Sequence, residues 1–181
     1  MTEYRPTSEH LLVLRDEDIF GTESGLDDSE YSERLTVKVI LFDKDNNVAL
    51  VGTKYHLLPG GGVEEDEELK DAVVRECKEE VGCDVEVESF VGTIEDFRSK
   101  TKRHQVTHCF VARVLGEKGV PTTTQEDEQG IEVEWMPLAD AYDFLERQID
   151  LIPNESYNSC FNVRMHTVFV EKFMNDDLGS E

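Results

Sequence analysis

The chain has 181 residues, of which 38% are hydrophobic, 8% are aromatic and 33% are charged. This length and apolar content suit one globular domain with a buried core. The formal net charge of -23 at pH 7 repels polyanions, so we expect neither a nucleic-acid polymer nor a membrane surface as a partner. A substrate that carries phosphates would need a cation to mediate its binding.

The cysteines and the start of the chain indicate the compartment. Cys77, Cys83, Cys109 and Cys160 form no CxxC pair and show no zinc-ligand spacing. The first residues, MTEYRPTSEHLL, contain no positively charged region followed by an apolar run. No apolar segment approaches the roughly 20 residues that cross a bilayer. We therefore expect a cytoplasmic protein with reduced thiols.

The N-terminal part of the chain predicts strands separated by a polar segment. HLLVL at 10–14 is a candidate strand, and the polar segment 16–33 is predicted to be a loop or a mobile arm. LTVKVILFD at 35–43 and VALVGT at 48–53 predict a hairpin. Residues 1–33 therefore form an N-terminal strand or arm, and three roles stay open: a partner-pairing arm, part of a substrate lid, or a disordered segment.

A break at YHLLPGGG precedes the strongest helical signal. The helix is expected from about Asp66 to Val81, and Gly82 provides its C-terminal stop. Strands are then predicted at 84–94, 105–115 and 130–136, and helices at 137–148 and 156–174. We assign residues 34–175 to the main domain and residues 176–181 to a disordered tail.

The predicted helix carries acids where its own pattern expects apolar side chains. Leu69, Val73 and Cys77 form an apolar stripe, and continuing along the stripe gives Glu76 and Glu80. With Glu79 on the adjacent flank, like charges at i,i+3 and i,i+4 cost about 0.2–0.5 kcal/mol per pair. The C-terminal end of a helix also disfavours negative charge. The apolar stripe, the spacing of like charges and the charge preference of the helix end are all violated at the same place, which indicates a functional site. A hard cation such as Mg²⁺ would compensate the repulsion between the carboxylates. The alternative is a solvated acidic face.

The spacing of these acids resembles a known signature. From Gly61 the chain reads G, five residues, E, seven residues, R-E-C, one residue, E-E, one residue and G-C, ending at Cys83. This is similar to the signature box of the Nudix hydrolases, G-x5-E-x7-R-E-U-x-E-E-x-G-U, at every fixed position. Cys77 and Cys83 are small for the bulky apolar positions U. The LPGG lead-in and Trp135 before a helix extend the resemblance over about residues 34–150.

The resemblance implies an α/β fold, a Nudix-type α/β/α sandwich with a mixed sheet, to which this chain adds a C-terminal helix. In that family the box binds Mg²⁺ or Mn²⁺ against a diphosphate. By position, the metal ligands are Gly61, Glu76, Glu79 and Glu80. Glu67 and Arg75 match a pair that orients the helix and its carboxylates, and Cys77 is expected to face the core.

The expected reaction is attack of water on a phosphorus atom, with metal neutralising the anionic oxygens and a carboxylate taking the proton. Glu76 is one candidate for that base. Some Nudix enzymes instead use a glutamate from the region before Trp135, where the candidates for a base or a further metal ligand are Glu126, Glu128, Glu132 and Glu134.

The segment RSKTKRH supplies four candidate phosphate contacts, Arg98, Lys100, Lys102 and Arg103. A local cluster of positive charge in so acidic a chain could steer or clamp a substrate phosphate; the alternative is a solvated hairpin tip. Candidates for stacking on a base, each also a candidate for the core, are Tyr55, Phe90, Phe97 and Phe110. His56 lies just before the LPGGG turn and is either near the pocket or structural.

The substrate class follows from elimination within the family. Nudix enzymes acting on ADP-ribose often carry a Pro, and those acting on dinucleoside polyphosphates a Tyr, shortly after the box; neither occurs between Cys83 and Gln105. A MutT-like nucleoside triphosphate pyrophosphohydrolase is the leading hypothesis, and an ADP-ribose or nucleotide-sugar pyrophosphatase is the alternative. A catalytically idle Nudix-fold ligand sensor is a third hypothesis, although such modules generally lose box acids. Many Nudix proteins dimerise, so a homodimer is a further expectation.

Overall fold

The structure is a computed structural model that describes residues 10–123 and 130–178. A single mixed sheet of six strands forms its centre. The strands are β1 (His10–Arg15), β2 (Ser32–Phe42), β3 (Asn47–Gly52), β4 (Asp84–Arg98), β5 (Arg103–Leu115) and β6 (Glu132–Pro137). The helices are α1 (Asp16–Phe20), α2 (Leu69–Glu76), α3 (Leu138–Leu151) and α4 (Tyr157–Leu178), with short helical segments η1 (Asp28–Glu30), η2 (Cys77–Val81) and η3 (Ser99–Thr101).

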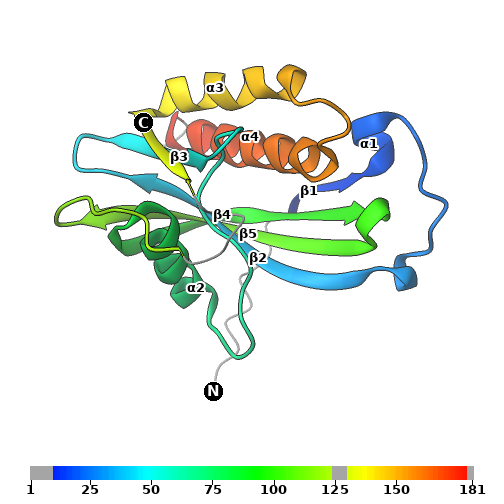
Figure 1. Ribbon diagram of the computed structural model, residues 1–181, viewed down its shortest axis with the longest axis horizontal. Coiled ribbons are helices and arrows are strands. Elements are labelled where there is room, and N and C mark those ends of the chain that lie inside the picture. Colours follow the sequence, from blue (N-terminus) through cyan, green and yellow to red (C-terminus); the bar gives the residue numbers. More distant parts are fainter. Residues whose placement is uncertain (1–9, 124–129, 179–181) are drawn as a thin grey trace.

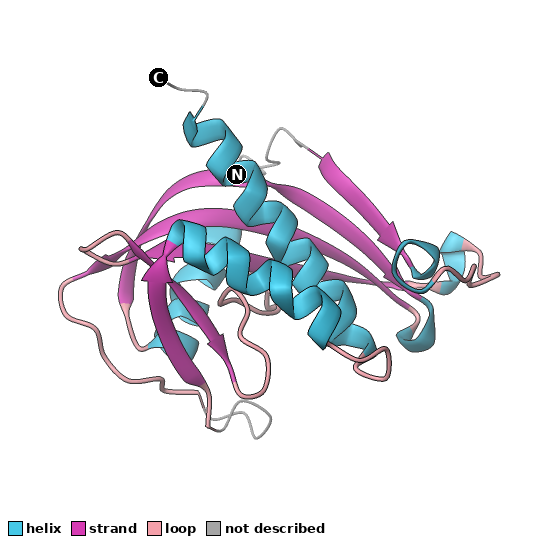
Figure 2. Ribbon diagram, turned by 90° about the horizontal axis from the view of Figure 1, so that it is seen from above, coloured by secondary structure: helices cyan, strands magenta, loops and turns pink. Residues whose placement is uncertain are grey.

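The strand order is β1-β4-β5-β2-β3-β6. β1 pairs with β4 and β2 with β5 in parallel, whereas the other neighbours are antiparallel. α2 lies on one face of the sheet and α3 and α4 on the other (Figure 1). Viewed from the α3 and α4 side, both helices lie across the strands (Figure 2). The predicted α/β/α sandwich with a mixed sheet and a C-terminal helix is confirmed.

The two-residue alternation of β2 divides the core into two layers. Val37 and Val39 are fully buried and belong to the cluster that includes Val73 of α2. Ile40 faces the opposite side and belongs to the cluster that includes Phe169 of α4. Because side chains alternate across a strand, β2 is apolar on both faces over residues 39–42.

The glycine-rich segment after β3 completes the centre of the sheet. β2 and β3 pair only beside their connecting turn, and β2 then pairs with the segment that starts at Pro59. The Val39 amide donates to the Pro59 carbonyl and the Val37 amide to the Gly61 carbonyl, each at 3.0 Å. Gly60 has φ +126°, and a Cβ there would lie 2.2 Å from the Val37 carbonyl oxygen. Only glycine therefore fits where this segment crosses β2.

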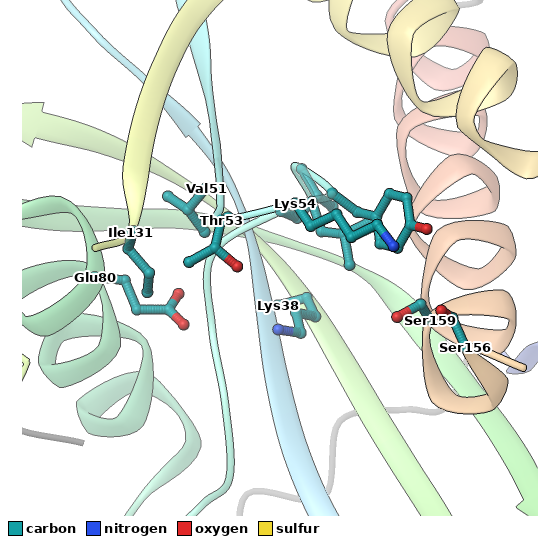
Figure 3. A pocket seen from close by; sticks show the side chains of 12 residues that line it. Lys38, Val51, Thr53, Lys54, Glu80, Ile131, Ser156 and Ser159 are labelled. Atoms are coloured by element: carbon teal, nitrogen blue, oxygen red, sulfur yellow. The ribbon is translucent and has the colours of Figure 1, made fainter. Parts of the chain in front are cut away.

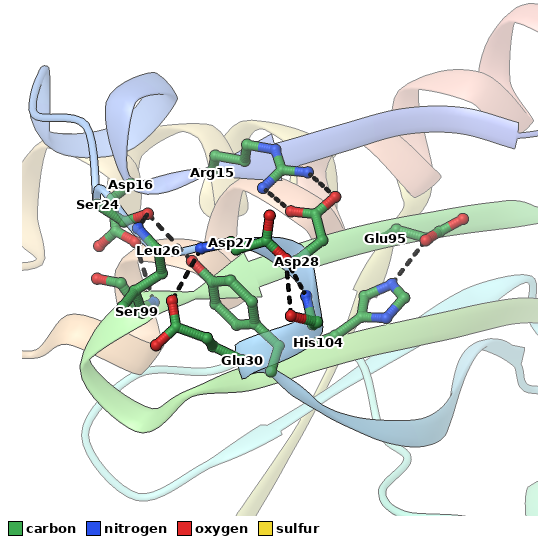
Figure 4. Close-up of polar contacts among 12 residues, drawn as sticks. Arg15, Asp16, Ser24, Leu26, Asp27, Asp28, Glu30, Glu95, Ser99 and His104 are labelled. Atoms are coloured by element: carbon green, nitrogen blue, oxygen red, sulfur yellow. Dashed lines mark hydrogen bonds and ion pairs between the residues drawn. The ribbon is translucent and has the colours of Figure 1, made fainter.

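The N-terminal segment is packed against the sheet along residues 10–33. The strand predicted at 10–14 is present as β1, which adds an edge strand to β4, whereas the segment predicted as a loop or mobile arm contains the short helices α1 and η1. The Arg15 guanidinium forms a two-pronged ion pair with Asp28 at 2.9 and 3.1 Å (Figure 4) and lies 3.9 Å from the Phe97 ring centroid. The buried carboxylate of Asp16 accepts a hydrogen bond from the Tyr157 hydroxyl at 2.7 Å.

Other boundaries differ from the predictions. β4 and β5 extend to Arg98 and Arg103, so most of the predicted connector 95–104 is strand. α4 runs to Leu178, three residues into the segment predicted as a tail. All four cysteines are free and buried. Within the described residues, the helices are too short or too polar to span a membrane.

Candidate active site

The box helix changes type in its middle. The predicted single helix 66–81 is an α-helix only over Leu69–Glu76 and continues as a π-helix over Cys77–Val81. It ends at Gly82, whose φ of 75° is left-handed as predicted and whose amide donates to the carbonyls of both Cys77 and Lys78. The wider turn changes the angle at which Glu79 and Glu80 leave the helix relative to Glu76. Cys77 is fully buried in the core, as expected.

Arg75 lies at the centre of the box and holds its carboxylates. The guanidinium donates to both carboxylate oxygens of Glu67, at 2.8 and 2.9 Å, and to Oε1 of Glu76 at 2.8 Å. It also donates to the Gly62 carbonyl at 2.8 Å and contacts Glu79 at 3.4 Å. The hydrogen bonds from Arg75 hold the pKa of Glu67 below its ordinary value, despite partial burial. This cation relieves much of the repulsion among the acids.

Glu76 and Glu80 converge on the glycine segment. Glu76 is 4% exposed, and its burial raises the pKa of the carboxyl although Arg75 opposes that shift. A Cβ at Gly61 would lie 2.6 Å from Oε1 of Glu76, so this glycine leaves room for the carboxylate. Oε2 of Glu80 accepts a hydrogen bond from the Gly60 amide at 2.7 Å. The Gly60 carbonyl in turn accepts one from the Lys38 ammonium.

These oxygens suit a hard divalent cation chemically, but they are not gathered around one point. Within residues 10–123 and 130–178, no group of three or more His, Cys, Asp or Glu side chains could hold a metal ion as placed. Glu76 and Glu79 turn toward Arg75, while Glu80 turns toward Gly60. The donor set of carboxylates beside a glycine backbone fits Mg²⁺ or Mn²⁺. Binding would require the carboxylates to exchange these protein partners for the ion.

A cavity of about 420 Å³ opens beside Glu80. Its walls come from the end of β3, the following loop, the box helix and α4. Figure 3 shows Glu80 on one side, Ser159 of α4 and the preceding Ser156 on the other, and Lys38 between them. The cavity is large enough to hold a small organic group next to the box.

Of the four aromatic candidates, Tyr55 lines this cavity. Phe110 is fully buried and Phe90 packs against the α2 side of the core. Phe97 stacks on the ring of His104 at 4.2 Å between centroids. These three are therefore packing residues. The remaining candidate for stacking on a substrate base is Tyr55.

His56 has a structural position. Its amide donates to Gln148 Oε1 at 3.0 Å, and its carbonyl accepts from Gln148 Nε2 at 2.7 Å. Its ring meets Phe144 edge-on, and its Nε2 lies 3.9 Å from Glu134. His56 thus joins the loop to α3 and is absent from the cavity lining.

The downstream glutamates divide into two groups. Glu126 and Glu128 lie outside the described residues. Glu132 and Glu134 are exposed on β6, where Glu134 faces His56 and α3. Val133 and Trp135 alternate with them and pack on the α2 side. The two described glutamates therefore lie on the sheet face opposite the box.

The predicted basic cluster is split by the turn that contains it. Arg98 and Arg103 line a second pocket of about 230 Å³, which also includes Gly61. Lys100 lies 4.8 Å from the Tyr157 ring centroid, and the side chain of Lys102 is 61% exposed. Neither lysine lines the pocket. Two further cations do, Arg34 and Lys38 of β2, which sequence reasoning missed. The available signal was a lysine inside an otherwise apolar strand, with an arginine four positions before it on the same face.

A family model and two curated relatives match parts of this chain. The family described as NUDIX domain matches residues 32–156. An ADP-ribose pyrophosphatase of Methanocaldococcus jannaschii is 34% identical over 82 residues, 42% of this chain and 48% of the relative. An RNA pyrophosphohydrolase of Wolbachia pipientis is 34% identical over 97 residues, 51% of this chain and 57% of the relative. The chain thus spans about half the length of these curated relatives.

Solved structures share the fold at low sequence identity. A MutT protein from Methanosarcina mazei aligns over 82% of this chain and 97% of its own, with a TM-score of 0.56 and 19% identity. A NUDIX hydrolase from Nitrosomonas europaea aligns over 80% and 90%, with a TM-score of 0.58 and 17% identity. The match of the family over residues 32–156, together with the box that the fold assembles around Arg75, leads to one assignment: this chain belongs to the NUDIX domain family.

Proposed function

We propose that the protein is a Mg²⁺-dependent hydrolase that cleaves the phosphoanhydride of a nucleoside diphosphate linked to another group; Mn²⁺ is the alternative ion. The observation that carries this proposal is the complete box, whose buried Glu76 and Glu80 meet the Gly60–Gly61 backbone beside a cavity. The names of the curated relatives, a pyrophosphatase and a pyrophosphohydrolase, support the reaction class.

Each box residue has a proposed role. Glu76, Glu79 and Glu80 would hold the ion with the help of the Gly61 carbonyl. When bound, the ion supplies charge neutralisation at the phosphates and lowers the pKa of a water. Arg75 and Glu67 are positioning residues, because the two-pronged pair between them fixes the side of the helix from which the carboxylates project.

A box carboxylate is the best supported proton acceptor. Glu76 is buried and has a raised pKa because of that burial, which suits a general base better than a fully solvated acid would. Glu132 and Glu134 are less suited, since they lie on the opposite face of the sheet. Glu126 and Glu128 remain candidates for the base or for a further ligand.

The substrate is proposed to be a nucleoside triphosphate, with ADP-ribose or a nucleotide sugar as the alternative. The cavity beside Glu80 would receive the nucleoside, and the ring of Tyr55 in its wall offers a stacking surface. The proposed setting is the cytoplasm, which suits a chain whose cysteines are all free thiols. The rival function, a ligand sensor without activity, is disfavoured because every box acid is retained.

The test is a substrate panel with Mg²⁺ that scores release of phosphate and pyrophosphate. The panel contains nucleoside triphosphates, nucleotide sugars, ADP-ribose and dinucleoside polyphosphates. Turnover of one class that is abolished by Glu80→Gln and by removal of Mg²⁺ is the expected result. Hydrolysis that persists without metal would refute the proposal. Binding of a nucleotide without turnover of any compound would favour the sensor.

A further inference from the structure

The pocket of about 230 Å³ beside Gly61 has four cationic side chains in its wall. Arg34 and Lys38 come from β2, Arg98 from the end of β4 and Arg103 from the start of β5. Such a concentration of positive charge is unexpected in a chain whose formal net charge is -23. The pocket lies next to the box. Gly61 faces the Glu76 carboxylate, and the Lys38 ammonium donates to the carbonyl of Gly60, whose amide donates to Glu80.

Strand register brings these cations together at an energetic cost. Arg98 and Arg103 are direct cross-strand partners in the antiparallel pair β4/β5. In the parallel pair β2/β5, Arg34 is opposite Gln105. Arg34 and Lys38 are four residues apart, so their side chains leave the same face of β2. Like charges directly opposite each other destabilise a sheet, and this arrangement therefore calls for a compensating charge.

Among the described residues, Arg98 is the one of these four cations that forms a close ion pair. Its guanidinium pairs with the buried Asp96 at 2.6 and 3.2 Å. Among the ion pairs formed within residues 10–123 and 130–178, none involves Arg34, Lys38 or Arg103. The charges of Glu80 and Glu76 favour the protonated form of Lys38, and the charge of Asp96 favours that of Arg103. Burial, together with neighbouring arginines, lowers the pKa of both Lys38 and Arg103.

Two amides of α4 add neutral donors to the same wall. Asn158 Oδ1 and Asn162 Oδ1 accept hydrogen bonds from Arg98 at 3.3 and 2.7 Å. Both residues line the pocket, and with their oxygens engaged their NH₂ groups are left to donate. Guanidinium, ammonium and amide donors on one concave surface match the oxygens of a phosphate group.

We propose that this four-cation pocket binds a further phosphate of the substrate, beyond the phosphate that is attacked at the box. The inference rests on the proposed function and narrows it to substrates whose leaving group is a phosphate chain. The cavity beside Glu80 and the four-cation pocket share Lys38. A nucleoside in the first and a terminal phosphate in the second would place the scissile anhydride between them. A sugar on the leaving side would leave the arginines without a counter-charge.

The first test measures binding of inorganic tripolyphosphate by calorimetry without divalent metal, so that it depends on neither turnover nor the metal site. The variants are Arg34→Gln and Arg103→Gln. The control is Arg113→Gln, which removes the same charge elsewhere on β5, where Arg113 pairs with Glu88. We expect each pocket variant to weaken binding about ten- to a hundredfold, the scale of one charged hydrogen bond, and the control to stay within about twofold.

Circular dichroism checks that each variant is folded. If the glutamine variants are unstable, Arg34→Lys and Arg103→Lys replace them, because lysine keeps the positive charge. The proposal is overturned if the wild-type protein does not bind tripolyphosphate, or if the pocket variants bind it as the control does. In these assays the lysine variants should retain part of the affinity. Binding by the wild type should also weaken as salt is added, because the contact is ionic.

The second test separates this proposal from the proposed function. With Mg²⁺, KM for a nucleoside triphosphate should rise about tenfold or more in Arg34→Gln and stay within about twofold of wild type in the control Arg113→Gln. If no compound is turned over but tripolyphosphate binding is lost in the pocket variants, the pocket stands and the hydrolase proposal fails. If triphosphate turnover is the same in Arg34→Gln and Arg113→Gln, the pocket proposal fails and the hydrolase proposal stands.

Discussion

Replacing Arg75 by methionine removes the cation that contacts Glu67, Glu76 and Glu79. The Glu76 carboxylate is 4% exposed and would lose its charged partner while staying buried. Removing one partner of a buried ion pair costs about 3–5 kcal/mol. Because the Arg75 side chain is 23% exposed, we expect the lower end, ~3 kcal/mol of unfolding free energy. For a chain of this size that corresponds to a fall in Tm of about 6–12 °C.

The loss should depend on pH in a defined direction. Burial already raises the pKa of Glu76, and without Arg75 that pKa rises further, so the carboxyl binds a proton at higher pH in the folded state. Glu67 has a lowered pKa because of Arg75 and would lose that stabilisation, which is present above its unfolded pKa. The Glu76 effect makes Arg75→Met costly at pH 8 and less costly at pH 5, whereas the Glu67 contribution declines only below its unfolded pKa.

The assay is urea denaturation followed by circular dichroism at both pH values. Arg113→Met is the matched control, because its partner Glu88 is 39% exposed and an exposed pair contributes about 1 kcal/mol or less. Arg75→Lys keeps the charge but loses the planar fork and should fall between wild type and Arg75→Met. A loss below about 1 kcal/mol at pH 8, or one that grows at pH 5, would refute the role given to Arg75.

Three further outcomes are expected. Gly60→Ala would place a Cβ 2.2 Å from the Val37 carbonyl and should lower Tm far more than Gly25→Ala, where φ is +67° but the space is open; equal losses would contradict the close approach. Burial would raise the pKa of Asp43, but the Lys118 ammonium and nearby amides lower that pKa overall. Asp43→Asn should therefore lower the free energy of unfolding, measured by urea denaturation, by about 1–3 kcal/mol at pH 7. The loss should become progressively smaller below about pH 4. Added NaCl should raise Tm by screening the net charge of -23; a falling Tm in differential scanning calorimetry would contradict this.

The box could be predicted because its chemistry lies within one short stretch of chain. Offsets along the helix identified Glu76, Glu79 and Glu80 as misplaced acids, and Gly82 as the helix end. The repulsion among these acids is weaker than helical spacing implies, because Arg75 donates to Glu76 and Glu79. Arg75 also reaches back to Glu67 and to the Gly62 carbonyl. Those contacts depend on the path of the loop, which helical spacing does not describe.

The π-helix at Cys77–Val81 could not be predicted from the sequence for a related reason. A widened turn is set by which carbonyl accepts from each amide, and here the Gly82 amide is shared between the Cys77 and Lys78 carbonyls. Residue composition does not distinguish that choice from an ordinary α-helical end. Periodicity therefore located the helix but not the direction in which its last acids point.

The four-cation pocket illustrates the limit set by long-range register. RSKTKRH was recognised as basic, but only the pairing of Arg98 with Arg103 across β4 and β5 separates these two arginines from Lys100 and Lys102. Arg34 joins them because β2 runs parallel to β5. No local pattern encodes that neighbour relation, since it depends on which strands become adjacent in the sheet.

Lys38 connects the two halves of the site. It lines both the cavity beside Glu80 and the four-cation pocket, and its ammonium donates to the Gly60 carbonyl while the Gly60 amide donates to Glu80. A phosphate arriving at Lys38 would compete with the Gly60 carbonyl for the ammonium, whose pKa is lowered by burial. An anion there would favour the charged form and draw it toward the substrate. Binding in one pocket would thereby change the hydrogen bonding of the glycine that holds Glu80, which couples recognition of the phosphate chain to the geometry of the box.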